Sequence, residues 1–237
     1  MTQWIKSKNE LMFVLAAAFI PFAPSGASAQ VGIAGEVTSS YVWRGFEIDD
    51  AFQAQPDVWF DVGNLTFGAW SSWALNGDGS EIDLYVSLYK ELPFGELNLS
   101  VTDYFYPQAE GDLSSFSNFN GGGDGAHMLE LGAEFTPTAA PLTFMVAWNA
   151  YNDPDNAAYG QVGTDFSLGD FADVHGEAGL LLTDSENYYG GSAGDITHFG
   201  VFLSRGLSLG EVAPYISTGF VRSEIEDSNY RIFAIGF

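Results

Sequence analysis

The sequence predicts an all-β protein: a transmembrane, antiparallel, up-and-down β-barrel of about 12 strands, preceded by a cleaved signal peptide. Three observations predict this fold. Apolar and polar residues alternate with a period of two, which is the period of a strand with one apolar face. Short and long connections between these segments follow one another in strict order. The chain ends on Phe237, the last residue of an amphipathic segment.

The N-terminal residues resemble a secretory signal. A short basic segment precedes an apolar run over residues 11–23, and residues 27–29 (Ala-Ser-Ala) form an A-x-A cleavage site. A membrane-spanning helix needs about 20 apolar residues, so this run is too short to serve as an anchor. We therefore expect residues 1–29 to be a signal peptide and residues 30–237 to be a single outer-membrane β-barrel domain that begins at Gln30.

The strands follow from the alternation. Ile82, Leu84, Val86 and Leu88 share one face of a pleated segment, and polar or tyrosyl residues occupy the other face. No window after residue 30 has a sustained helical period. The predicted strands cover residues 31–43, 54–62, 65–74, 81–90, 96–106, 127–136, 142–151, 157–167, 172–183, 196–205, 211–222 and 229–237.

The connections fall into two sets that alternate along the chain. The short ones are residues 63–64, 92–95, 137–141, 168–170 and 207–210. The long ones are richer in Gly and acidic residues: 44–53, 76–80, 107–126, 152–156, 184–195 and 223–228. Twelve antiparallel strands with short periplasmic turns and long extracellular loops produce this alternation.

A soluble β-sandwich is the alternative fold, because its strands also have a period of two. The predicted strands are longer than typical sandwich strands and match a tilted membrane crossing. Aromatic residues also gather toward the predicted strand ends, where two interfacial girdles would lie. They are Tyr41, Trp43, Trp73, Tyr89, Phe105, Tyr106 and Tyr151.

The last predicted strand carries Phe233, Ile235 and Phe237 on one face. This ending resembles the terminal signal by which outer-membrane proteins are recognised for insertion. We therefore expect the three residues to form an assembly signal, with the barrel-assembly machinery as a partner. The expected location is the bacterial cell outer membrane.

A family resemblance lies in the first third of the mature chain. Residues 39–46 (Ser-Ser-Tyr-Val-Trp-Arg-Gly-Phe), Gln55-Pro56 and residues 67–72 (Phe-Gly-Ala-Trp-Ser-Ser) resemble the S-x-Y-x-[FW]-R-G and G-x-W-x-S motifs of the TorF-type porin family. This family is also called the Gcw_chp group. Ser40 stands where that family commonly has Asp. The resemblance implies an outer-membrane barrel that forms a small pore, and it implies no substrate.

The charge balance predicts an acidic lumen. Seven Lys and Arg stand against 31 Asp and Glu, which excludes a basic nucleic-acid groove. If the aliphatic face of each strand meets lipid, the opposite face lines the lumen. The predicted pore-lining residues are Glu36, Arg44, Asp57, Asp61, Asp83, Glu130, Glu134, Asp165 and Glu177.

Two main functions remain open. An acidic lumen in an open barrel would make a small porin that passes small solutes with a preference for cations. Alternatively, the carboxylates hydrogen-bond Arg44 and tyrosines in a closed structural or interaction barrel, whose acidic loops bind a partner. The loop over residues 107–126, with its Gly121–Gly123 run, either folds inward as a constriction or is mobile.

An outer-membrane lipid-modifying enzyme is a more remote alternative. The candidate bases are His127, His175 and His198, and no nucleophile or metalloprotease motif accompanies any of them. We assign no catalytic, cofactor-binding or metal-binding residues and expect no cofactor. The segment over residues 76–83 fits a hairpin turn better than a Ca²⁺ loop. Outer-membrane lipid and lipopolysaccharide are expected partners of the barrel.

Overall fold

The computed structural model describes residues 29–77, 79–107, 113–208 and 213–237. All of the expected signal peptide except Ala29 lies outside these residues. Within the part of the chain that is described, no helix has the length and apolar character needed to cross a membrane.

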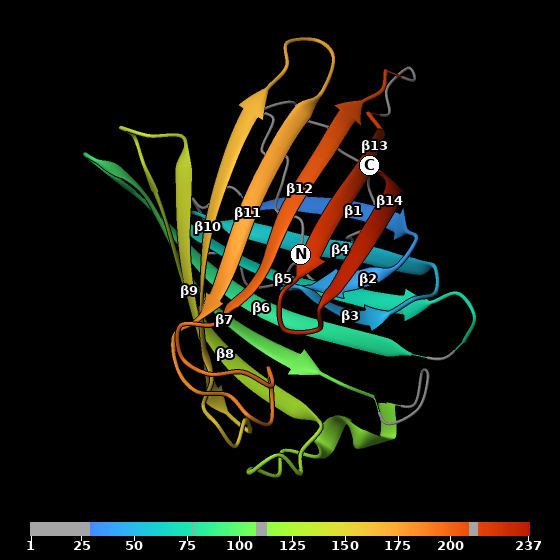
Figure 1. Cartoon of the computed structure of the whole chain (residues 1–237), viewed down its shortest axis with the longest axis vertical. Coiled ribbons are helices and arrows are strands. Elements are labelled where there is room, and N and C mark those ends of the chain that lie inside the picture. Colours follow the sequence, from blue (N-terminus) through green and yellow to red (C-terminus); the bar gives the residue numbers. More distant parts are fainter. Residues whose placement is uncertain (1–28, 78, 108–112, 209–212) are drawn as a thin grey trace.

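Twelve strands form one closed antiparallel barrel, which confirms the predicted fold class (Figure 1). Each strand pairs with its neighbour in the chain, and β14 pairs with β1 to close the ring. The barrel strands are β1 (Ala29–Thr38), β4 (Gln53–Val62), β5 (Leu65–Ala74), β6 (Ser80–Leu92), β7 (Gly95–Phe105), β8 (His127–Pro137), β9 (Leu142–Tyr151), β10 (Ala158–Ser167), β11 (Asp173–Leu181), β12 (Ile196–Gly206), β13 (Tyr215–Ser223) and β14 (Ser228–Gly236).

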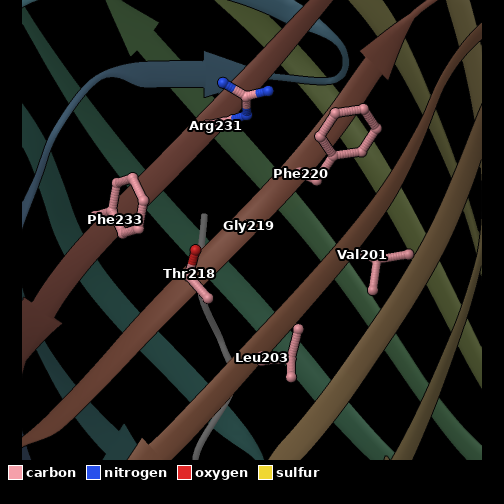
Figure 2. Close-up of a pocket in the computed structure, with 7 residues that line it drawn as sticks. All are labelled: Val201, Leu203, Thr218, Gly219, Phe220, Arg231 and Phe233. Carbon is pink, nitrogen blue, oxygen red and sulfur yellow. The ribbon is translucent and has the colours of Figure 1, made fainter.

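Alternation along the strands separates an apolar outer face from a polar lumen. On β6, Leu84, Val86 and Leu88 point outward and are exposed, whereas Asp83 and Ser87 point inward and are buried. The outward residues of β12, β13 and β14 continue this surface, part of which is seen in Figure 2. Exposed apolar side chains cover the wall of the barrel, as a surface in contact with lipid requires.

The connections lie at two ends of the barrel. Brief turns such as residues 63–64 and 93–94 join strands at one end, which we call the short-turn end. Longer segments, among them residues 182–195, join strands at the opposite, long-loop end. Because successive strands are antiparallel, this alternation follows from the order of turn lengths in the sequence.

The first predicted strand, 31–43, is wrong at its C-terminal end. The barrel strand β1 stops at Thr38, and the chain then forms a separate two-stranded hairpin, β2 (Tyr41–Trp43) with β3 (Phe46–Asp49). The alternation continues through Trp43 because these residues are still in a strand, but the strand pairs with β3 and not with the barrel. The start predicted for the eleventh strand, residue 211, lies outside the described residues, and β13 begins at Tyr215.

The C-terminus completes the seam between β14 and β1. The amide of Phe237 donates to the carbonyl of Gly35 at 3.0 Å, and the amide of Gly35 donates to the carbonyl of Phe237 at 3.3 Å. Phe233, Ile235 and Phe237 all point outward, with 61%, 54% and 61% of their surfaces exposed. The Phe237 ring lies beside Gly35, at van der Waals distance from the position that a Cβ would take there.

Candidate functional site

The β2–β3 hairpin folds into the lumen at the long-loop end. Its two turn residues, Arg44 and Gly45, have φ angles of 51° and 92°, the combination required by a tight two-residue hairpin turn. Glycine is also needed sterically at the tip, since a Cβ on residue 45 would lie 2.6 Å from the Cβ of His198 on β12. The hairpin therefore crosses the lumen from β1 and touches the wall at β12.

Arg44 connects the tip of the hairpin to the opposite wall. Its guanidinium donates to both carboxylate oxygens of Glu130 on β8, at 2.6 and 2.9 Å. It also donates to the hydroxyl of Tyr189 at 2.7 Å. Arg44 has only 7% of its surface exposed and Glu130 has 6%, so this is a buried, bidentate ion pair.

Electrostatics keep Arg44 charged in this site. Burial lowers the pKa of Arg44, but the adjacent Glu130 carboxylate raises it, and the net result lies well above the ordinary arginine value. Burial raises the pKa of the Tyr189 hydroxyl to about 12, so this group stays protonated while its oxygen accepts from Arg44. Tyr104 donates to Glu130 at 3.1 Å and satisfies a further oxygen lone pair.

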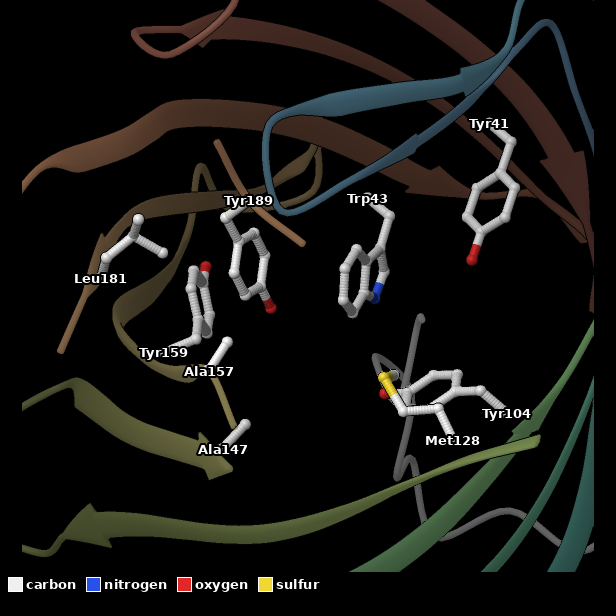
Figure 3. Close-up of a cluster of buried hydrophobic side chains, with 9 residues drawn as sticks. All are labelled: Tyr41, Trp43, Tyr104, Met128, Ala147, Ala157, Tyr159, Leu181 and Tyr189. Atoms are coloured by element: carbon white, nitrogen blue, oxygen red, sulfur yellow. The ribbon is translucent and has the colours of Figure 1, made fainter. Parts of the chain in front are cut away.

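Aromatic rings surround the ion pair, and those of Trp43, Tyr159 and Tyr189 are drawn in Figure 3. The guanidinium carbon of Arg44 lies 4.3 Å from the Trp43 ring centroid and 4.4 Å from that of Tyr159. The rings of Trp43 and Tyr189 stack at 6.0 Å with an interplanar angle of 10°. Cation–π contacts of this kind stabilise a desolvated guanidinium. The aromatic cluster and the hairpin lie together inside the lumen at this level, which we call the lumen constriction.

The loop over residues 182–195 supplies Tyr189 and is held by a neighbouring loop. The Asp155 carboxylate accepts from the side-chain amide of Asn187 at 2.8 Å and its backbone amide at 2.6 Å, and from the backbone amide of Tyr188 at 3.3 Å. The hydroxyl of Ser185 accepts from the backbone amide of Tyr189 at 3.1 Å. The constriction therefore involves two loops as well as the barrel wall.

A pair of buried carboxylates lies beside the hairpin. Glu81 and Asp83, two residues apart on β6, both point inward and are 6% and 8% exposed. Their charge and burial raise the pKa of the Tyr41 hydroxyl on β2, with burial the largest cause. One oxygen of Asp83 and the indole nitrogen of Trp43 are buried without a hydrogen-bond partner among the described residues.

A third group joins β10, β11 and β12 inside the barrel. Glu177 accepts from Gln161 at 2.9 Å, and its carboxylate oxygens lie 3.2 Å from His175 and 3.0 Å from His198. His175 also lies 3.2 Å from Asp165. No three His, Asp or Glu side chains are arranged to hold a metal ion within the described ranges.

The structure places the residues predicted to line the pore as follows. All eight carboxylates are at inward positions of the alternating strands, and Arg44 is at the tip of the hairpin. Three of these carboxylates accept a hydrogen bond from a neighbouring hydroxyl: Asp57 from Tyr85 at 3.1 Å, Asp61 from Thr66 at 2.5 Å, and Glu36 from Tyr215 at 2.7 Å. Of the predicted set, only Arg44 and Glu130 meet in the constriction. Their role in lining a conducting pore stays a prediction.

Sequence reasoning missed several residues of the constriction. Glu81 lies on the same inward face of β6 as Asp83, so the alternation with a period of two was sufficient to predict its inward position. Tyr41 and Trp43 were expected in an interfacial girdle, and this was wrong because the hairpin buries both of them in the lumen. Nothing in the local pattern distinguishes Tyr159 or Tyr189 from other tyrosines.

In the predicted 107–126 loop, Phe116 and Phe119 lie against the outer face of the wall and pack on His127, with ring centroids 5.2 and 3.9 Å away. Gly123 and Gly125 of the same loop line a pocket with Tyr188 at the long-loop end. The two nitrogens of His127 contact the Asp103 carboxylate at 3.0 Å and the carbonyl oxygen of Phe116 at 2.8 Å. These contacts anchor the loop on β7 and β8.

Two solved structures share this fold at low sequence identity. One is a KdgM porin, and the other is a KdgM porin in complex with disordered oligogalacturonate. Each has a TM-score of 0.50 and 9% identity, and each match covers 88% of this chain and 96% of the other. No family model matches the sequence, and no curated protein matches it. The comparisons establish a porin-type 12-stranded barrel, and the resemblance to the TorF-type family stays a prediction.

Proposed function

We propose that this chain is an outer-membrane channel that prefers cations and is narrowed at its long-loop end by the β2–β3 hairpin. The observation that carries the proposal is the separation of charge across the wall. The eight carboxylates predicted to line the pore occupy inward positions along the barrel, and Asp103 on β7 faces outward beside His127. Lys90, Arg205, Arg222 and Arg231 all occupy outward positions. Among the described residues, Arg44 is the one lysine or arginine on the lumen side.

Arg44 does little to offset this acidic lining. Its charge is matched by Glu130 in a bidentate pair, so Asp57, Asp61 and the other inward carboxylates stand without a lysine or arginine partner. Two unit charges 4 Å apart interact by about 4 kcal/mol at an effective dielectric constant near 20. A narrow lumen lined in this way attracts cations and repels anions.

The solute class we propose differs from that of the structural neighbour. Oligogalacturonate is a chain of carboxylated sugars and hence a polyanion. Inward carboxylates would repel such a chain on entry, so the shared barrel fold is combined here with the opposite electrostatic preference. Small cations and small neutral solutes suit this lumen.

Reversal potentials across a planar bilayer with a salt gradient test the proposal. The full chain should show cation selectivity that weakens as salt rises, because screening shortens the range of the carboxylates. The double variant Asp57→Asn/Asp61→Asn should lower the cation preference while the barrel still folds. Asp170→Asn, in the exposed turn between β10 and β11, is the matched control and should leave it unchanged. Anion selectivity would contradict the proposal.

The closed interaction barrel is a second candidate, favoured by the packing of the hairpin against Glu130, Tyr159 and Tyr189. The same bilayers distinguish it. If neither the wild-type chain nor a variant lacking the Arg44–Glu130 pair conducts ions, the lumen is closed and the acidic loops are the functional surface.

A further inference from the structure

The outward face of β12–β14 carries Arg231 among mostly apolar side chains. Arg231 is exposed on β14, and Phe220 is its cross-strand neighbour on β13. Val201 follows in the same row on β12. The next row toward the short-turn end consists of Leu203, Thr218 and Phe233. These six side chains, with Gly219, line a shallow depression on the outside of the barrel (Figure 2).

Arg231 has no counter-charge in the described part of the chain. Among the described residues it forms no ion pair, whereas Arg222 is paired with Glu224 at 3.1 Å and with Asp227. A guanidinium on a lipid-facing wall is costly unless it reaches the interface or a partner: about 2–4 kcal/mol at the bilayer midplane and about 0–1 near its edge. An anion from outside the chain would supply the partner that Arg231 lacks among the described residues.

The position of Arg231 along β14 indicates where that anion lies. Arg231 is three residues from Ser228, where β14 begins at the long-loop end. At about 3.4 Å per residue and a strand tilt near 40°, this is roughly 8 Å below the strand end. Arg222 lies diagonally across on β13, one row closer to the loops. In the proposed membrane location, with the long-loop strand ends at the outer surface of the bilayer, this depth is close to the level at which lipid headgroups meet acyl chains.

We propose that this depression, which we call the Arg231 site, binds a phosphorylated glycolipid of the outer leaflet, with a phosphate on Arg231 and an acyl chain over the apolar row below. The proposal rests on the proposed membrane location, which sets the long-loop end in the outer leaflet. Charge selects the ligand: Arg231 is an outward cation that forms no ion pair among the described residues, and a lipid phosphate would supply the counter-charge. The depression lined by Val201, Leu203 and Phe233 provides the apolar contact.

Native mass spectrometry of the full chain in detergent tests this site with lipid A as the probe. Arg231→Gln should lower lipid A affinity about tenfold, because a charge-assisted hydrogen bond to phosphate is lost. Arg231→Lys should retain part of it. Arg205→Gln is the matched control, because Arg205 is also an outward arginine but lies near the short-turn end of β12. It should bind lipid A as the wild-type chain does.

Three results would overturn the site. If Arg231→Gln binds lipid A with the affinity of the wild-type chain, Arg231 does not contribute to the site. If phosphate-free lipid A binds as tightly as lipid A, the site contacts only the acyl chains. If a glycerophospholipid binds as tightly as lipid A, the site has no preference for a glycolipid. The ion selectivity of Arg231→Gln should match the wild type, so a failure of this site and a failure of the proposed channel are distinguishable.

Discussion

Arg44 is the residue on which the lumen constriction depends most. It is buried, it makes a bidentate pair with Glu130, and it stacks between Trp43 and Tyr159. Removing one member of a buried ion pair leaves the other charge desolvated and unpaired. The pair therefore matters less for its net contribution to stability than for the position in which it holds the hairpin tip.

We predict that Arg44→Gln lowers the free energy of unfolding by about 3–5 kcal/mol, because Glu130 is left buried without its partner. The single-channel conductance should rise as the hairpin loosens. Urea unfolding in detergent and bilayer recordings measure the two effects. Adding Glu130→Gln to the first variant should restore part of the stability, since two neutral amides can hydrogen-bond. Unchanged stability in Arg44→Gln would show that the pair does not hold the hairpin.

At the scale of elements, the constriction consists of the β2–β3 hairpin and the loop over residues 182–195, which are brought together inside a rigid barrel. The loop is tied at Asp155 to the neighbouring loop between β9 and β10. Hydrogen bonds from the side chain and backbone of Asn187 lower the pKa of Asp155 below the ordinary aspartate value. The folded loop thus favours the carboxylate over the carboxylic acid.

This shift gives the loop a pH dependence with a definite sign. A folded-state pKa below the unfolded value means that Asp155 stabilises the loop at pH values above about 3.9, and this stabilisation is lost as pH falls through the folded-state pKa. The Asn187 and Tyr188 amides should therefore stay protected from hydrogen exchange between pH 7 and pH 5. They should lose protection in stronger acid, after correction for intrinsic exchange rates.

The variant Asp155→Asn should lose that protection already at pH 7, because an amide cannot accept all of the contacts that the carboxylate accepts. Asp170→Asn, in a turn at the other end of the barrel, serves as the control. Full protection of Asn187 in Asp155→Asn would exclude Asp155 as the anchor of the loop.

At the scale of the whole molecule, the barrel is stable only when the ring is closed. The β1–β14 register pairs three residues of each strand, which is the shortest register between neighbouring barrel strands. The backbone bonds between Gly35 and Phe237 extend it, as does the bond from the amide of Ser39 to the carbonyl of Phe233 at 2.8 Å. The C-terminal residue therefore contributes backbone hydrogen bonds to closure in addition to an exposed ring.

We predict that deleting Phe237 lowers the amount of heat-modifiable folded barrel in the outer membrane. Phe237→Ala keeps the backbone bonds with Gly35 and removes only the ring, so it separates closure from recognition. If the ring is the assembly signal, Phe237→Ala should lower the folded yield as much as the deletion does. If the backbone hydrogen bonds at the β1–β14 seam matter more than the ring, only the deletion should lower the folded yield. A normal folded yield of both variants would show that Phe237 serves neither assembly recognition nor barrel closure.

Local pattern was sufficient to predict the barrel. A period of two specifies a strand and its apolar face, and turn lengths specify which ends of the strands neighbour one another. The predicted strand ends agree with the structure to within two residues, apart from the end of the first strand and the start of the eleventh. The inward positions of residues such as Asp57 and Glu134 follow from the same alternation.

Only the tertiary structure decided what fills the barrel. Tyr41 and Trp43 have the same alternation as a barrel strand, yet they pair with β3, because the turn at Arg44 and Gly45 reverses the chain. Arg44 then meets Glu130, 86 residues away, and Tyr189, 145 residues away. A period of two predicts which face of a strand a side chain occupies. The contacts of Arg44 with Glu130 and Tyr189 form only when the closed ring brings distant strands and loops to the same depth of the lumen.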